Sequence, residues 1–248
     1  MISTIETYLK EHQIEDKVSL FYHKPSTNDT YVYRENVMML AASTIKVPVV
    51  MAWTDLVHQG AASYDTELEY CERHYEESDA KALYDSYGYG QCAPLKECME
   101  LAIVYSDNPS NHMMREYYQN YTGITFRQWF AQFSDQRVSE EFYTRNLISA
   151  EIMLNVMKRL YEHQDQYSQL IDWMKIAAKG QYIQSNNFDF EVAQKYGEYD
   201  RYEHTMAILY QKEPVLVGIF TELAGDIAKK TIRDLAKIMA LSSNQQKW

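Results

Sequence analysis

Apolar residues recur along this chain with two different periods, and the period changes from one segment to the next. Residues 17–24 (KVSLFYHK) alternate apolar and polar side chains, and residues 31–40 (YVYRENVMML) follow a turn-forming stretch, PSTND. Alternation with a period of two is typical of strands, so these segments are expected to form a β-hairpin. The residues before them, 1–17, have the pattern of a short amphipathic helix.

The middle of the chain has helical spacing instead. In residues 43–60, Ile45, Val49, Ala52 and Leu56 lie three or four positions apart, and Gly60 is a plausible helix stop. The segment 61–92 is polar, rich in tyrosine and without a clear period. Five later segments are predicted to be helical, namely 94–107, 108–121, 125–133, 149–163 and 167–177.

The period returns to two near the end. Residues 190–199, 204–211 and 213–222 have strand patterns with tight links, and 225–241 form an amphipathic helix by period. Early and late strands can pair into one antiparallel sheet, with the middle of the chain as a helical insertion. The predicted fold is therefore α+β. It comprises a discontinuous sheet domain of residues 1–50 and 180–248 and a helical domain of residues 51–179, which together form a single structural unit.

The net charge of the chain bears on which kinds of partner it can bind. The 248 residues carry a formal net charge of −11, which argues against binding a nucleic-acid backbone or an anionic membrane surface. The sequence has no apolar run long enough to span a bilayer and no signal-peptide pattern at its start. We expect a monomer in the cytoplasm, with secretion as the alternative if a signal peptide was removed. Three cysteines are too few for a disulfide scaffold.

The stretch STIK places Ser43 and Lys46 three positions apart in an otherwise apolar helix. Residues at this spacing share a helix face, so the lysine can accept the proton of the serine hydroxyl. A lysine that acts as a base near pH 7 needs its pKa lowered by about 3 units, or about 4 kcal/mol. The alternative is a chance S-x-x-K pattern in which the ammonium extends to water.

Two further motifs can likewise be interpreted either as part of an active site or as ordinary local structure. In YSDN, Ser106 can relay a proton and Asn108 can offer an amide, although Ser, Asp and Asn also favour helix ends as caps. In QKYGEY, Lys195 and Gly197 interrupt a predicted strand. A ligand that approaches the backbone at Gly197 would account for this, as would an edge strand with a bulge.

Taken together, S-x-x-K, S-D-N and K-x-G occur in an order and setting that resemble class A β-lactamases and penicillin-binding proteins, over essentially the whole chain. The resemblance implies a five-stranded antiparallel sheet flanked by helices, plus an all-helical lobe. It also implies that Ser43 is acylated, that Lys46 helps to take its proton and that Ser106 passes a proton to the leaving nitrogen. Asn108 would bind the side-chain amide of the substrate and Lys195 its carboxylate. The backbone N–H groups of Ser43 and Glu198 would form the oxyanion hole.

The chain departs from the family at two places. Tyr196 occupies the middle of the K-x-G triplet, where the family has Thr or Ser, so carboxylate recognition is expected to be weakened or altered. The loop segment 134–146 is short, and Glu140 and Glu141 are the acids near its middle. Glu141 is the candidate base for the deacylating water, although its spacing to Asn146 does not match the family. Slow deacylation is therefore expected.

The sequence-based hypothesis is a serine hydrolase that opens a β-lactam amide through an acyl-enzyme. The alternatives are a cell-wall peptidase or esterase of the penicillin-binding type and a catalytically inactive ligand-binding relative. The expected partner is a small-molecule β-lactam or an acyl-peptide.

No cofactor or metal is expected, because cofactor motifs are missing and Cys71 and His74 lack a second Cys/His pair. His112 could suggest a Ser-His-Asp triad, but no G-x-S-x-G elbow accompanies it. Catalysis is assigned to Ser43, Lys46, Ser106 and Glu141, and substrate binding to Asn108, Lys195, Tyr196, Gly197 and Glu198.

Overall fold

The computed structural model describes residues 1–78 and 80–243, which form two compact units. Unit 1 is assembled from three separate stretches of the chain and unit 2 from two. Unit 1 comprises Met1–Thr44, Phe133–Glu162 and Ala178–Trp248, and unit 2 comprises Ile45–Gln132 and His163–Ala177.

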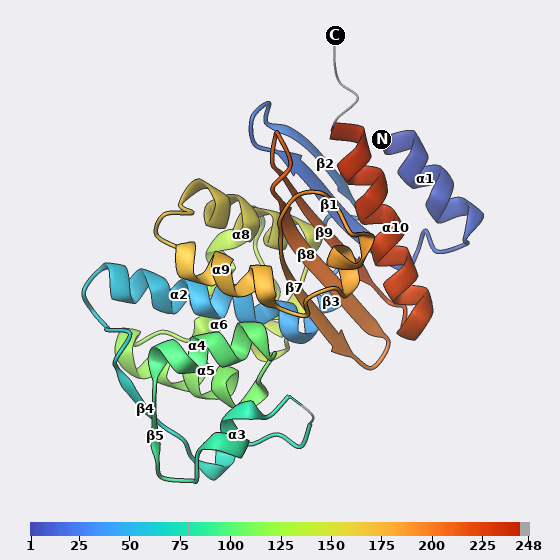
Figure 1. Cartoon of the computed structure of the whole chain (residues 1–248). Coiled ribbons are helices and arrows are strands. Elements are labelled where there is room, and N and C mark those ends of the chain that lie inside the picture. Colours follow the sequence, from blue (N-terminus) through green and yellow to red (C-terminus); the bar gives the residue numbers. More distant parts are fainter. Residues whose placement is uncertain (79, 244–248) are drawn as a thin grey trace. The chain divides into compact units, whose positions relative to one another are not determined.

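The centre of unit 1 is an antiparallel five-stranded sheet (Figure 1) with the strand order β2-β1-β9-β8-β7. Strands from both ends of the chain therefore share one sheet, as the alternating patterns predicted. The late strands β7, β8 and β9 are consecutive neighbours, and β9 pairs with β1. The strands are β1 (Val18–Lys24), β2 (Asp29–Tyr33), β7 (Val192–Tyr199), β8 (Tyr202–Leu209) and β9 (Val215–Thr221).

Helices cover both faces of this sheet, so β1, β8 and β9 are buried almost throughout. In Figure 1, α1 (Ile2–Glu11) and α10 (Gly225–Ser243) lie against one face and α8 (Ala150–Glu162) against the other. The apolar stripes of α1 and α10 meet alternate residues of the strands in one continuous core. Ser149 caps α8, because its hydroxyl accepts a hydrogen bond from the N–H of Ile152 at 3.2 Å.

The predicted second strand of the early hairpin is wrong in extent. Residues 29–33 form β2, but the chain then leaves the sheet and forms β3 (Met39–Leu40). β3 pairs with β6 (Leu147–Ile148), which follows the short helix α7 (Glu140–Thr144). This two-stranded connection joins the chain before Ser43 to the end of the short loop segment.

Unit 2 is mainly helical, with α2 at its core. Trp53 is fully buried and its indole N–H donates to the carbonyl of Met114 at 2.9 Å. The segment 61–92, which has no clear period, contains a small two-stranded sheet, β4 with β5. The elements are η1 (Ala42–Ile45, at the boundary), α2 (Lys46–His58), β4 (Glu67–Glu69), η2 (Glu72–His74), α3 (Ala82–Ser86), β5 (Cys92–Pro94), α4 (Leu95–Val104), α5 (Asn108–Thr122), α6 (Phe126–Phe130), η3 (Ala131–Phe133, at the boundary) and α9 (Ser168–Ile176), with η4 (Tyr182–Asn186) in unit 1.

The division into units differs from the domain boundaries that the sequence suggested. The segment 133–162, which includes α8, lies in the unit of the sheet, whereas the sequence pattern grouped it with the helical part. Within residues 1–78 and 80–243, no helix combines the length and the apolar composition that crossing a lipid bilayer requires.

Candidate functional site

Ser43 lies in the short 3-10 helix η1, which runs directly into α2. The residue before it, Ala42, has a φ of 45°, a conformation that costs a non-glycine residue about 1–2 kcal/mol. Hydrogen bonds hold the chain on either side. The N–H of Ala41 donates to the carbonyl of Asn146 at 2.7 Å, and the Asn146 amide donates to the carbonyl of Ala42 at 3.3 Å. The strained turn before Ser43 is thus fixed by the segment that ends the short loop.

Gly197 lies against this same turn within unit 1. A Cβ atom at Gly197 would come 2.5 Å from the backbone nitrogen of Ser43 and 2.9 Å from that of Thr44. The sequence suggested a ligand close to the backbone here, but the neighbour that requires glycine is the chain itself. Gly197 therefore allows β7 to approach the Ser43 backbone directly.

In unit 2, the Lys46 ammonium is buried at the start of α2 and points at the S-D-N motif. Its Nζ donates to the carbonyl oxygen of Ser106 and to Oδ1 of Asn108 at 2.6 Å. The hydroxyl of Ser106 lies 3.3 Å from the same nitrogen. The structure thus brings together Lys46, Ser106 and Asn108, three of the residues that the sequence selected, and the alternative of a lysine that extends to water is wrong.

Burial lowers the pKa of Lys46 from its ordinary value of 10.5 to about 7, and the carboxylates of Asp107 and Glu76 oppose this shift. Removal of an ammonium from water favours its neutral form, because the low-dielectric interior solvates charge poorly. A substantial fraction of the amine is therefore neutral near pH 7. This is the property that a lysine base requires.

Local structure explains how S-D-N presents its side chains to Lys46. Asp107 is the N-cap of α5, and its Oδ2 accepts from the backbone N–H of Ser110 at 2.7 Å. Its Oδ1 accepts from the N–H of Leu83 at 3.0 Å. Ser106 has a φ of 59°. The capping interpretation of this motif is right for Asp107, and that cap leaves Ser106 and Asn108 facing the lysine.

A residue that the sequence analysis did not select, Ser78, completes this group. The Asn108 amide donates to Oγ of Ser78 at 3.3 Å, while its backbone N–H donates to the carbonyl of Ala80 at 2.8 Å. Ser78 lies in the aperiodic segment 61–92, where no spacing rule points to it. Its role could only emerge from the three-dimensional structure.

The remaining K-x-G residues lie on the edge strand β7 of unit 1. Lys195 is fully buried, and its Nζ lies 4.2 Å from the centroid of the Tyr196 ring. The Tyr196 ring stacks on Tyr182 with centroids 4.8 Å apart. The Tyr182 hydroxyl donates to the carboxylate of Glu198, which also pairs with Lys229 at 3.2 Å. Tyr196 packs partly against the core beneath α1 and α10.

Glu141 lies on α7 with its side chain half exposed. Its carboxylate forms an ion pair with Arg145, one helical turn further along. This places the candidate deacylation base in a solvated i,i+4 pair on the helix surface.

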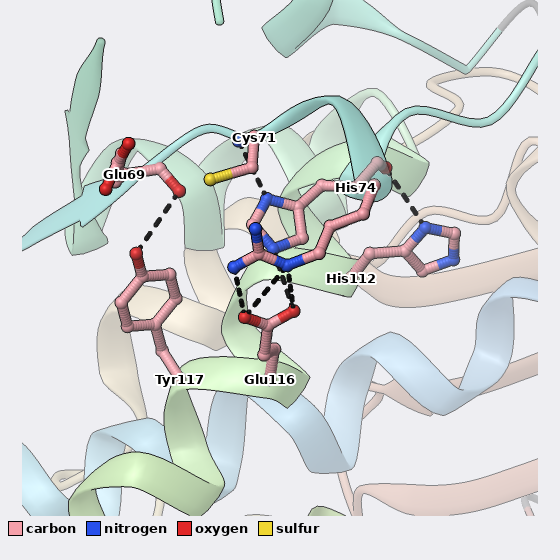
Figure 2. A network of polar contacts seen from close by, with 7 residues as sticks. Glu69, Cys71, His74, His112, Glu116 and Tyr117 are labelled. Atoms are coloured by element: carbon pink, nitrogen blue, oxygen red, sulfur yellow. Dashed lines mark hydrogen bonds and ion pairs between the residues drawn. The ribbon is translucent and has the colours of Figure 1, made fainter. Parts of the chain in front are cut away.

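The Cys71 and His74 region forms a hydrogen-bonded network in unit 2 (Figure 2). The buried His74 ring accepts from the N–H of Cys71 at 3.1 Å and contacts Glu116 at 3.2 Å, and Arg73 contacts the same carboxylate. His112 contacts the carbonyl of His74 at 3.1 Å rather than a serine hydroxyl. In the part of the chain that the structure describes, no three His, Cys, Asp or Glu side chains gather closely enough to hold a metal ion.

Comparison with solved structures places this fold among β-lactamases and penicillin-binding proteins. A mutant of PBP-A in an acyl-enzyme complex with penicillin G matches with a TM-score of 0.82 and 13% identity, over 99% of this chain and 97% of that chain. A β-lactamase from Xanthomonas campestris pv. campestris matches with a TM-score of 0.78 and 14% identity, over 94% of this chain and 95% of that chain. A class A β-lactamase described as the last common ancestor of Gram-negative bacteria matches at 0.79 and 18%, over 98% of both chains. At these identities the likeness shows the β-lactamase/transpeptidase-like fold, as the three motifs implied.

No curated protein sequence matches the chain. Residues 2–242 match the family Beta-lactamase2, described as the "Beta-lactamase enzyme family". This match spans both units and all three motifs. The chain therefore belongs to the β-lactamase enzyme family.

Proposed function

We propose that this protein is a serine hydrolase that opens the amide bond of a β-lactam through an acyl-enzyme on Ser43. The observation that carries the proposal is the state of Lys46, a buried amine with a pKa of about 7 that contacts Ser106 and Asn108. Ser43 and Lys46 are three residues apart in the sequence, a spacing at which side chains on a helix share one face. A neutral lysine at this spacing suits removal of the serine proton.

In the proposed acylation step, the neutral Lys46 amine takes the proton of Ser43 Oγ as that oxygen bonds to the substrate carbonyl carbon. The carbonyl π-electrons move to oxygen, and the backbone N–H groups of Ser43 and Glu198 stabilise the resulting oxyanion. Each such donor is worth about 10²–10³ in rate. The C–N bond then breaks, and the Ser106 hydroxyl gives its proton to the leaving nitrogen. Ser106 recovers a proton from the Lys46 ammonium, which it contacts.

The proposed roles in substrate binding follow from the same motifs. Asn108 offers its amide to the substrate side chain, with its orientation held by Ser78 and Lys46. Lys195 supplies positive charge from β7. Tyr196 stacks on Tyr182, so this chain offers no short hydroxyl at the middle position of the triplet. We therefore expect weaker selection for a substrate carboxylate than in relatives with Thr or Ser there.

A second candidate, a penicillin-binding peptidase or esterase with a persistent acyl-enzyme, is favoured by the position of Glu141. A carboxylate that is half exposed and paired with Arg145 is poorly suited to activate a water for hydrolysis. The PBP-A structure that matches this fold is itself an acyl-enzyme complex with penicillin G. Slow release of the acyl group distinguishes this candidate from an efficient β-lactamase.

Mass spectrometry of the intact protein after mixing with penicillin G tests both candidates. The expected result is a covalent adduct of the full penicillin mass that appears on wild type and is missing from the Ser43→Ala variant. Peptide mapping should place the adduct on the segment that contains Ser43. An adduct that persists for minutes or longer supports the penicillin-binding candidate, whereas product formation with little adduct supports an efficient β-lactamase.

Two outcomes contradict the proposal. If wild type neither forms an adduct nor hydrolyses a chromogenic cephalosporin, β-lactams are not acylating substrates. If the Ser43→Ala variant reacts as fast as wild type, another group is the nucleophile.

A further inference from the structure

His204 is a fully buried histidine in the centre of strand β8 of unit 1. It lies directly opposite Gly197 of β7 and opposite Phe220 of β9 in the strand register. Cross-strand partners point to the same face of a sheet. His204 therefore shares a face with Gly197, whose open Cα meets the Ser43 backbone.

Both ring nitrogens of His204 bind backbone groups. The N–H of Thr221 donates to Nδ1 at 3.1 Å, and Nε2 lies 2.7 Å from the carbonyl oxygen of Leu40. A backbone N–H can only donate and a carbonyl can only accept, so Nδ1 carries the lone pair and Nε2 carries the proton. The partners thus determine the tautomer.

The charge state agrees with this geometry. Burial lowers the pKa of His204 to about 4, and the backbone carbonyls of Leu40 and Glu203 oppose this shift. The rings of Phe220 and Tyr202 lie beside it, at 5.5 Å and 6.0 Å between centroids. The ring is neutral at neutral pH, and it has one donor and one acceptor.

The Leu40 carbonyl is close to the proposed nucleophile along the chain. Leu40 ends the two-residue strand β3, and the strained Ala42 and then Ser43 follow. A two-residue strand is a weak anchor by itself, because it offers few ladder hydrogen bonds. The hydrogen bond from His204 adds an attachment between this segment and the centre of the main sheet.

We infer that His204 is a positioning residue for the acylation reaction, acting through the bond from Nε2–H to the Leu40 carbonyl. This inference rests on the proposed function of Ser43. The bond ties the turn that carries the nucleophile to β8, and β8 in turn pairs with the β7 strand that carries Gly197 and Glu198. The nucleophile and the proposed oxyanion donors thereby share one rigid support. A displacement of about 1 Å in such a support costs about 10²-fold in rate.

Two substitutions separate the two hydrogen bonds of the ring. In His204→Gln, the side-chain amide nitrogen reaches about the place of Nε2 and can donate to Leu40. In His204→Asn, the shorter side chain can accept from the N–H of Thr221 near the place of Nδ1 but cannot reach Leu40. Both variants replace a buried imidazole by an amide, so their losses of stability are expected to be similar.

His23 provides the matched control. It is a second buried histidine of the same sheet, on β1, and its Nδ1 bonds to the Thr30 hydroxyl at 2.8 Å. Its strand is separated from β8 by β9, so its side chain lies away from the bond between His204 and Leu40. His23→Gln and His23→Asn are expected to lose stability but to leave the acylation rate within about twofold of wild type.

The experiment combines two measurements on the full chain. The rate of adduct formation with penicillin G is measured by quenched mass spectrometry. Hydrogen–deuterium exchange of peptides spanning residues 39–46 reports whether the turn is held, with no need for activity. We expect His204→Asn to acylate about 10²-fold more slowly and to exchange faster in this segment. We expect His204→Gln to stay within about tenfold of wild type in rate and close to it in exchange.

Equal exchange in residues 39–46 for both His204 variants, or exchange no faster than in the His23 variants, overturns the positioning role. Equal loss of acylation rate in His204→Gln and His204→Asn overturns it as well. Failure of the proposed function has a different outcome, because wild type itself would then form no adduct while the exchange data still decide the role of His204.

Discussion

At the scale of one residue, burial of the Lys46 ammonium lowers its pKa. Its ammonium contacts a carbonyl, a hydroxyl and an amide oxygen, none of which carries a full negative charge. Polar but neutral partners satisfy its hydrogen bonds without replacing the lost solvation of the charge. The pKa of about 7 is the consequence.

The rate of acylation is therefore expected to rise with pH through a midpoint near 7, because only the neutral amine can take the proton of Ser43. The adduct-forming rate with penicillin G, measured from pH 5 to pH 9, tests this. A rate that is flat across this range, or that falls as pH rises through 7, would show that Lys46 is not the base.

Glu76→Gln supplies the control for this assignment. The Glu76 carboxylate raises the pKa of Lys46, so its replacement by a neutral amide should shift the midpoint of the rate profile to lower pH. Its side chain is about half exposed, so the fold should tolerate the change. A midpoint that does not move would assign the profile to another group.

Gly197 carries a second prediction at this scale. In Gly197→Ala the new methyl group meets backbone nitrogens of Ser43 and Thr44, which have no rotamer by which to move away. We expect a loss of about 1–3 kcal/mol in stability and an acylation rate lower by about 10²-fold. Urea unfolding and adduct formation measure the two effects.

Gly88→Ala is the matched substitution. A Cβ atom at Gly88 would meet only the Gln91 side chain, at 3.5 Å, which is ordinary van der Waals contact. This variant should keep wild-type stability within about 0.5 kcal/mol and wild-type acylation. If Gly197→Ala also keeps wild-type stability and acylation, the close approach of β7 to the Ser43 backbone is not required for either property.

At the scale of one element, the start of α5 depends on Asp107. Its carboxylate accepts from two backbone N–H groups and from the Ser110 hydroxyl, and the residue is fully buried. Asp107→Ala leaves these donors without their acceptor, so we expect a loss of about 2–4 kcal/mol in unfolding free energy. The removal of this charge should also lower the midpoint of the Lys46 rate profile.

Thr125→Ala is the comparison variant, because Thr125 caps α6 through a reciprocal pair with Gln128 at the surface. Its loss should be about 1 kcal/mol, with no effect on the pH profile. Comparable losses in the two variants would mean that Asp107 is an ordinary cap.

The elements themselves were largely predictable from the sequence. Long segments with a clear period, such as α5, α8 and the strands β7 to β9, lie where the pattern placed them. The strands β3 to β6 contain two or three residues each, which is too few for any period to appear. Ser78 and the contact of Asn146 with the turn before Ser43 could not be predicted for a different reason, because both depend on hydrogen bonds to distant segments.

At the scale of the whole molecule, buried neutral histidines link stability to pH. Burial lowers the pKa of His204 and of His23 to about 4, from an ordinary value of 6.5. Above pH 6.5 both histidines are neutral in the folded and in the unfolded protein, so their contribution to the free energy of unfolding does not change with pH. Between pH 6.5 and 4 the unfolded chain binds protons that the folded chain does not, so the free energy of unfolding falls.

The fall contributed by His204 is on the order of 3 kcal/mol at most, because the group is fully buried. Urea unfolding from pH 4 to pH 8 measures it. In His204→Gln this part of the pH dependence should disappear while the contribution of His23 remains. An identical pH dependence in wild type and variant would show that His204 also protonates freely in the folded protein.

The candidate site was predictable only as a set of motifs. Local patterns left Lys46 and Asn108 with both a catalytic and a structural interpretation, and the order of the three motifs indicated the β-lactamase family. Positioning residues such as His204 lie in ordinary strand sequence. Their contacts depend on register, which one sequence does not display.

The pairing of β1 with β9 also bears on how the protein is made. During synthesis the hairpin of β1 and β2 leaves the ribosome long before its central partner exists. The last residue of unit 2, Ala177, is also made before all three late strands, so most of the chain is synthesised while the hairpin still lacks β9. In that interval β1 presents an unpaired apolar edge, which is a substrate for chaperones and a starting point for aggregation. Yield in a cell should therefore depend on the speed of the last steps of translation.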